Sequence, residues 1–162
     1  HLGKYAAVEE EILAAREELE RLRDRLVTLT DRDAQAFEPL SRAYGLPKNT
    51  EEEKAAREKI MESALYEASV VPMEIMETVL SSMDLLETLG EKGSRLALSD
   101  VGVGILFAQA ALEGASLNVF INTRLMKDRS QAEELNARAD RMIAEGREKK
   151  ERIYSQVLQS VK

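Results

Sequence analysis

One acidic residue interrupts the apolar face of the first long helical pattern in the sequence. Steps of three and four residues along this pattern meet only apolar side chains, at Ile12, Ala15, Leu19, Leu22, Leu26 and Leu29. The next steps fall on Asp33, then on Ala36 and Leu40. A carboxylate that is partly removed from water has a raised pKa, which suits it to general acid–base catalysis near neutral pH. Asp33 is therefore the candidate catalytic residue.

A structural explanation of Asp33 is equally compatible with the sequence. Burying an unpaired charge costs several kcal/mol, so a helix that turns a carboxylate inward must pair it, hydrate it or use it. An ion pair with Arg32 or Arg57, or a polar position of the coiled-coil type, would meet that need without any catalytic role.

Two amides interrupt an otherwise apolar segment later in the chain. Asn118 and Asn122 stand four residues apart, on one face of the predicted helix. They could hold a polar heterocycle in place. Alternatively they satisfy each other and the backbone carbonyls that Pro72, which has no N–H, leaves without a helical partner.

Three charged residues complete the set of candidate ligand contacts. Lys48 lies in a predicted turn and Lys4 near the start of the chain, and either could meet an anion. Asp100 follows a predicted helix N-cap, where a carboxylate also complements the helix dipole.

Residue counts exclude much other chemistry. The sequence has no cysteine and one histidine, His1, so disulfides, thiolate nucleophiles and histidine-based triads are ruled out. The Glu-x-x-His pattern of di-metal helix bundles is absent, and we expect no metal.

Composition favours a single all-α domain over residues 1–162. The sequence is 44% hydrophobic and 33% charged, which is enough apolar material for a core. No segment alternates apolar and polar residues over the length of a strand. The net charge of −7 has the wrong sign for nucleic-acid binding. We expect no membrane span and a cytoplasmic protein, since neither a signal peptide nor an uninterrupted apolar run of spanning length is present.

Capping and breaking residues divide the chain into a bundle of long kinked helices. The first is predicted from Ala6 to Tyr44 with a bend at Pro39, and it ends before Gly45-Leu46-Pro47. A capping box of Thr50 and Glu53 opens the second, which is kinked at Pro72.

The second half of the chain predicts three more helices. A short helix from Met83 to Leu89 ends at Gly90 and Gly93. The third long helix begins at a Ser99-Asp100 cap and runs to about Met126; it is apolar or small on nearly every side, which places it at the centre of the bundle. Ser130, with Glu133, opens a charged amphipathic helix.

An ordered set of short motifs resembles one known family. These motifs are DRDAQAF at 31–37, LPKNT at 46–50, SVVP at 69–72, SDVGV at 99–103 and NVFIN at 118–122. Together they resemble the formiminotransferase-cyclodeaminase C-terminal domain family, which includes stand-alone cyclodeaminases and methenyltetrahydrofolate cyclohydrolases. The family's proline- and glycine-rich opening segment has no counterpart in the sequence as it is printed.

The resemblance implies a dimeric helical enzyme that acts on a tetrahydrofolate substrate without a metal. It assigns catalysis to Asp33 and folate binding to Lys48, Asp100, Asn118 and Asn122, and Gly3-Lys4-Tyr5 resembles a shortened form of the family's Gly-Lys motif. Conversion of 5-formiminotetrahydrofolate to 5,10-methenyltetrahydrofolate and ammonia is the first expectation. Methenyltetrahydrofolate hydrolysis is the second, and a non-catalytic helical binding or scaffold protein is the third.

Overall fold

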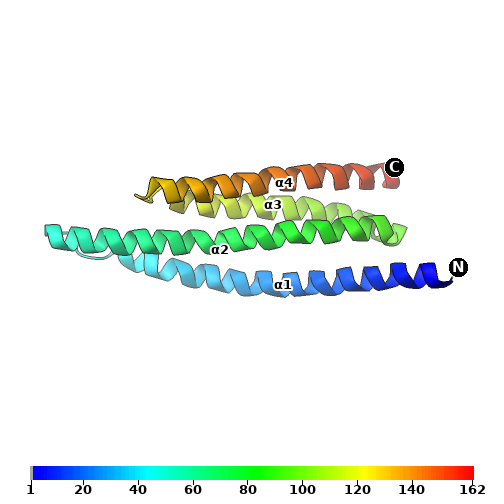
Figure 1. Ribbon diagram of the computed structural model, residues 1–162, viewed down its shortest axis with the longest axis horizontal. Coiled ribbons are helices and arrows are strands. Elements are labelled where there is room, and N and C mark those ends of the chain that lie inside the picture. Colours follow the sequence, from blue (N-terminus) through cyan, green and yellow to red (C-terminus); the bar gives the residue numbers. More distant parts are fainter. Residues whose placement is uncertain (1) are drawn as a thin grey trace.

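The computed structural model describes residues 2–162, and their side chains from Ala6 onward. This part of the chain forms four long helices and no strand, which confirms the all-α class. The helices are α1 (Leu2–Tyr44), α2 (Glu51–Lys92), α3 (Leu98–Thr123) and α4 (Arg129–Val161), and a short 3₁₀ turn, η1 (Arg95–Ala97), precedes α3. Successive helices run in opposite directions (Figure 1).

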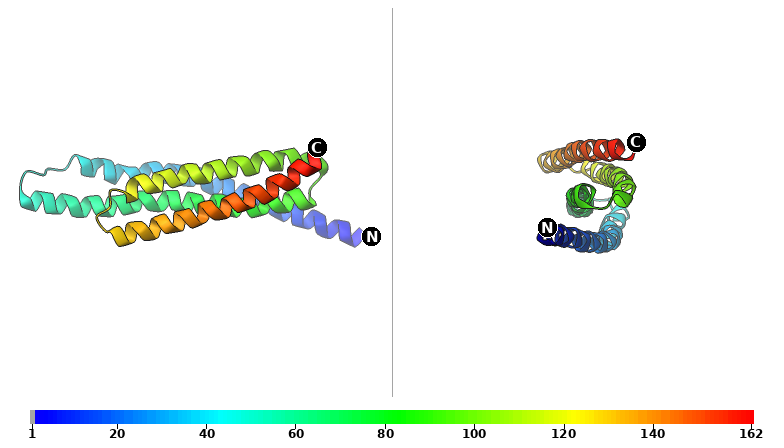
Figure 2. Two further views of the ribbon diagram at one scale, coloured as in Figure 1. Left: turned by 90° about the horizontal axis from the view of Figure 1, so that it is seen from above. Right: turned by 90° about the vertical axis from the view of Figure 1, so that its right-hand side faces the viewer.

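Helix α2 is the shared packing partner of the bundle. It packs against α1, α3 and α4, whereas α1 makes no other extensive helix contact within residues 2–162. Seen along the bundle, α1 and α4 lie on opposite sides of α2 (Figure 2). The buried core contains Leu65, Met76 and Met83 of α2 together with Ile105 and Leu112 of α3.

The break between α1 and α2 is where the sequence predicts it. Helix α1 continues through Pro39 and ends at Tyr44. The Thr50 hydroxyl accepts a hydrogen bond from the Glu53 N–H at 3.1 Å, and the Glu53 carboxylate accepts one from the Thr50 N–H at 3.3 Å, so the capping box is confirmed.

The predicted short helix from Met83 to Leu89 is wrong as a separate element, because α2 runs without a break to Lys92. Ser81 lies within this helix, and its hydroxyl donates to the Glu77 carbonyl four residues back, at 3.0 Å. Gly90 serves close packing and does not end the helix: a Cβ at this position would stand 3.3 Å from a methyl group of Val101.

Two predicted helix starts also need correction. Helix α3 continues directly from η1 with Ala97 at its N-cap, so Ser99 and Asp100 lie inside its first turn. Helix α4 is capped by Asp128, whose carboxylate accepts a hydrogen bond from the Gln131 N–H at 3.0 Å. The carboxylate of Asp128 therefore caps the helix where the sequence analysis assigned Ser130.

Helix α3 is buried on one side only. Residues such as Ile105, Leu112 and Val119 are fully buried against α2 and α4. The other side leaves large apolar side chains in contact with solvent, at Val103, Leu106, Phe107, Leu117 and Ile121. This differs from the expectation that the helix is enclosed, and the apolar character of that side needs another explanation.

Residues Arg95–Thr123 are also long and apolar enough to cross a membrane, judged by length and composition alone. A single helix of this kind is weak evidence of a membrane span, because core helices of globular proteins meet the same criterion.

A glycine lets α4 approach α3 closely. A Cβ at Gly146 would overlap the buried ends of Leu112 and Gln109. We expect Gly146→Ala to lower the free energy of unfolding by about 1–2 kcal/mol, because overpacking outweighs the gain in helix propensity. Denaturant unfolding measures this change. Gly104→Ala is the control, since its Cβ would meet only Leu86, at an ordinary 3.4 Å; equal effects of the two substitutions would contradict the prediction.

Candidate functional site

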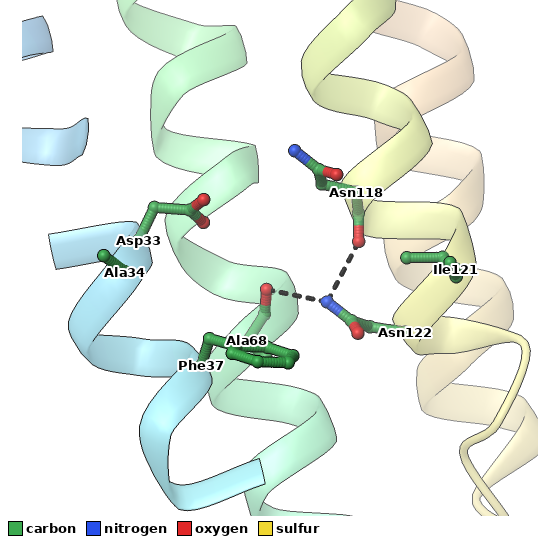
Figure 3. Close-up of a pocket in the computed structure, with 7 residues that line it drawn as sticks. All are labelled: Asp33, Ala34, Phe37, Ala68, Asn118, Ile121 and Asn122. Carbon is green, nitrogen blue, oxygen red and sulfur yellow. Dashed lines mark hydrogen bonds between the residues drawn. The ribbon is translucent and has the colours of Figure 1, made fainter. Parts of the chain in front are cut away.

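The candidate site is a pocket between α1 and α3, with α2 at its base. Its volume is about 400 Å³. The lining comprises Asp33, Ala34 and Phe37 of α1, Ala68 of α2, and Asn118, Ile121 and Asn122 of α3 (Figure 3). The structure thus brings together three of the residues that the sequence singles out, Asp33, Asn118 and Asn122, from helices that are far apart in the chain.

Asp33 enters this pocket as a half-buried carboxylate without a cation. Among the described residues it makes neither an ion pair nor a side-chain hydrogen bond, whereas Arg32 binds Glu74 of α2 with an Nη1–Oε2 distance of 2.7 Å. Burial raises the pKa of the Asp33 carboxyl above its ordinary value. The ion pair with Arg32 or Arg57 that could have explained Asp33 structurally is therefore not formed.

Asn122 donates a hydrogen bond to the backbone carbonyl that Pro72 leaves without a helical partner. Proline has no N–H, so the Ala68 carbonyl four residues earlier lacks its helical donor. The Asn122 side chain supplies that donor, with Nδ2 at 3.0 Å from the Ala68 oxygen and at 3.0 Å from the Asn118 carbonyl oxygen. This confirms the structural alternative for the Asn122 amide nitrogen. The hydrogen bond to Ala68 also ties α3 to α2 at the base of the pocket.

Asn118 differs from Asn122 in its partners. Its side chain is exposed and makes no hydrogen bond among the described residues. In Figure 3 it points from α3 towards the side of the pocket that bears Asp33. An amide in this position has both a donor and an acceptor to offer to a ligand.

Phe37 and Ile121 are pocket residues that the sequence analysis did not single out as site residues. Phe37 lies one helical turn after Asp33 and is 54% exposed, and Ile121 on the facing helix is 62% exposed. Together they give the pocket two apolar walls, which suit a flat conjugated ring. The available signal was the spacing of four residues that places Phe37 beside Asp33.

The other candidate residues do not reach this pocket within the chain. Lys48 is exposed in the loop after α1 and is not among the lining residues. Asp100 is exposed in the first turn of α3, where it borders a separate apolar cavity of about 460 Å³ with Leu89 and Val101. At 1.5 Å per residue it lies about 27 Å along α3 from Asn118. The side chain of Lys4 falls outside the described residues.

The described part of the chain contains no cluster of side chains that could bind a metal ion. No group of three or more histidine, cysteine, aspartate or glutamate side chains gathers there. The arrangement offers instead one carboxylate with a raised pKa, amides on the facing helix, and apolar walls. These parts can bind a flat polar ring and move a proton beside it.

Comparison with known proteins gives a consistent result. The model of the formiminotransferase-cyclodeaminase family matches residues 2–141. A methenyltetrahydrofolate cyclohydrolase of Methylorubrum extorquens is 40% identical over 158 residues, which are 98% of this chain and 76% of the relative. The formimidoyltransferase-cyclodeaminase of Mus musculus is 34% identical over 122 residues, which are 75% of this chain and 23% of that longer protein.

A solved structure agrees with the sequence matches. The crystal structure of a formiminotetrahydrofolate cyclodeaminase from Thermotoga maritima superimposes with a TM-score of 0.83 at 26% sequence identity. The match covers 98% of this chain and 75% of the other.

Proposed function

Because the chain belongs to the formiminotransferase-cyclodeaminase family and is a folate-dependent enzyme, we propose that it hydrolyses the one-carbon bridge of 5,10-methenyltetrahydrofolate. One observation carries the choice of reaction: the 40% identical relative, which spans 98% of this chain, is named a cyclohydrolase. This reverses the order given by the sequence analysis, which placed cyclodeamination first. The pocket supports the proposal by its apolar walls and single unpaired carboxylate.

In the proposed mechanism Asp33 manages the protons. A water molecule attacks the methenyl carbon and gives one proton to the Asp33 carboxylate, so that a hydroxylated bridge forms between N5 and N10. The carbon–N5 bond then breaks, N5 takes the proton from Asp33, and the hydroxyl loses its proton to solvent as the formyl C=O forms. A raised pKa favours the first step, because a stronger base accepts the proton more readily.

The remaining lining residues hold the substrate in this proposal. The ring of Phe37 and the side chain of Ile121 lie against the conjugated ring system, and Asn118 hydrogen-bonds its polar edge. The Lys48 ammonium, in the loop after α1, meets the carboxylates of the glutamate tail. Lys4 lies near the other end of α1, about 43 Å along the helix from Asp33 at 1.5 Å per residue, so within one chain it does not contact the same substrate.

Cyclodeamination is the second candidate, and the likeness to the Thermotoga maritima cyclodeaminase favours it. The same residues would serve: Asp33 would take the N10 proton as N10 attacks the formimino carbon, and would return it to the departing ammonia. The two reactions differ in the nucleophile, which is water in one and N10 in the other.

The near-ultraviolet absorbance of the methenyl bridge separates the candidates. We expect 5,10-methenyltetrahydrofolate to lose this absorbance faster with the protein than in buffer. Formation of the bridge from 5-formiminotetrahydrofolate, with release of ammonia, would establish the cyclodeaminase instead. No change with either substrate would leave a non-catalytic folate-binding or scaffold bundle.

A homodimer is part of the proposal, and the exposed side of α3 is its interface. We define the α3 stripe as the side chains spaced alternately by four and three residues: Val103, Phe107, Ala110, Gly114, Leu117 and Ile121. This is the spacing of a coiled-coil seam, and Phe107 is 72% and Leu117 67% exposed in the single chain. Large apolar patches of this kind mark association surfaces. Because Ile121 also lines the pocket, a partner on the stripe would stand beside the substrate.

A further inference from the structure

An ionic cluster joins α1 to α2 next to the turn of α1 that carries Asp33. The guanidinium of Arg32 donates two hydrogen bonds to the Glu74 carboxylate, Nη1–Oε2 at 2.7 Å and Nη2–Oε1 at 3.4 Å. Arg25, two turns earlier, places Nη2 at 3.7 Å from the same carboxylate and donates from Nε to the Thr78 hydroxyl at 3.3 Å. The Glu74 side chain is only 25% exposed. One carboxylate therefore serves two arginines.

This cluster and the substrate pocket lie on different sides of the α1–α2 contact. Glu74 borders a cavity on the α4 side of α2, together with Leu135 and Arg138. Asp33 faces the pocket on the α3 side. Arg32 and Asp33 are neighbours in sequence, yet their side chains are committed to different surfaces.

Helix α1 contains a second Arg-Asp pair of sequence neighbours, in which no residue of α2 binds the arginine. Arg23 and Asp24 form the same Arg-Asp pair of neighbours on α1, and no residue of α2 engages Arg23. There the two side chains bind each other, with Nη2–Oδ1 at 3.1 Å and Nε–Oδ1 at 3.2 Å. An arginine on α1 can thus reach the aspartate that follows it when nothing else holds it.

We propose that Glu74 is a positioning residue for the reaction at Asp33: by holding Arg32 on the α4 side of the α1–α2 contact, it keeps the Asp33 carboxylate without a cationic partner. The inference rests on the proposed function of Asp33. Among the described residues of one chain, Asp33 is the only ionisable residue that lines the pocket, since α2 contributes Ala68 and α3 contributes Asn118, Ile121 and Asn122. An arginine beside an aspartate favours the ionised form, lowers the carboxyl pKa and weakens the base.

Glu74→Gln tests the inference, since the neutral amide no longer holds the two arginines by charge. We expect kcat above the acidic limb of the pH–rate profile to fall by about ten-fold, and that limb to move to lower pH. The double variant Arg32→Gln, Glu74→Gln removes the released cation that adjoins Asp33 and should return both quantities to within about two-fold of the original. The other arginine, Arg25, lies two turns before Asp33 and keeps its hydrogen bond to Thr78. A merely structural role of Glu74 would leave the double variant as slow as the single one, or slower.

Glu77→Gln is the matched control. Glu77 lies three residues further along α2 and pairs with Arg138 of α4, so its loss removes a similar ion pair without releasing a cation from α1. We expect its pH–rate profile to be unchanged. An unchanged profile for Glu74→Gln, or a double variant without recovery, would overturn the inference.

A second readout does not depend on turnover. Carboxyl carbon NMR of the aspartates gives the pKa of Asp33 in the substrate-free protein, and we expect it to be lower in Glu74→Gln than in the original or in Glu77→Gln. Equal values in all three proteins would overturn the inference even if catalysis were present. Conversely, if Asp33 proves dispensable for turnover, the proposed function fails while this titration still decides whether Glu74 isolates Asp33.

Discussion

Replacing Asp33 by asparagine is expected to lower kcat by about 10²- to 10⁴-fold, the usual contribution of a positioned acid–base group. Asparagine keeps the size and polarity of the side chain but can neither accept nor return the proton. The decay of methenyl absorbance measures the loss. Asp31→Asn is the control, because Asp31 is an exposed residue of the same helix that does not line the pocket. Loss of only a few-fold would remove Asp33 from the mechanism.

The same variant should be at least as stable as the original protein at neutral pH. Burial raises the pKa of Asp33 in the folded state, so ionisation of this group favours the unfolded chain. The protonated Asp33 carboxyl favours the folded state, and this contribution to stability is fully present at pH values below the unfolded-state pKa. It is lost as the pH rises through the folded-state pKa. A marked fall in thermal stability on Asp33→Asn would indicate a structural role that accounts for the lost activity.

The second large effect is expected at the α3 stripe. Phe107→Glu places a charge within the proposed interface, where a buried unpaired charge costs about 3–5 kcal/mol, so the dimer dissociation constant should rise by at least 100-fold. The fold should persist, because Phe107 is 72% exposed within one chain. Sedimentation equilibrium measures the association.

Ala144→Glu is the control for the dimer. Ala144 is an exposed residue of α4, and its substitution adds the same charge away from the stripe. We expect this variant to sediment like the original protein. A monomeric original protein, or a Phe107→Glu variant that stays dimeric, would contradict the proposed interface and require another role for the exposed side of α3.

Asp33 could be singled out from sequence because its position is abnormal: it continues an apolar repeat. The structure shows it half-buried and, among the described residues, without an ionic partner, which decides between alternatives that the sequence left open. The structural role of Asn122 could be inferred from sequence for a similar reason, since Pro72 leaves a backbone carbonyl that some hydrogen-bond donor must satisfy. In both cases a local rule is broken at a known place, and the physical need that follows can be reasoned out from one chain segment.

The positions of Lys48 and Asp100 relative to Asp33 could not be predicted in this way. Motif membership says nothing about where a helix start lies after folding, and Asp100 proves to border a different cavity. Likewise, Gly90 could not be recognised as a packing glycine before Val101 of α3 was known to face it. Such features depend on contacts between segments that are distant in sequence, which propensity and periodicity do not contain.

The attachment of α1 to α2 alone has a thermodynamic consequence. Within the described chain, the helix that bears Asp33 and Phe37 packs extensively on one neighbour, while the amides and Ile121 stand on α3. Detachment of α1 therefore breaks a single helix–helix interface, its extensive one with α2, and separates the two walls of the pocket. A folate molecule that touches both walls would resist this local unfolding, so its binding energy adds directly to the docking stability of α1. Folate affinity and the docking of α1 onto α2 are therefore thermodynamically linked.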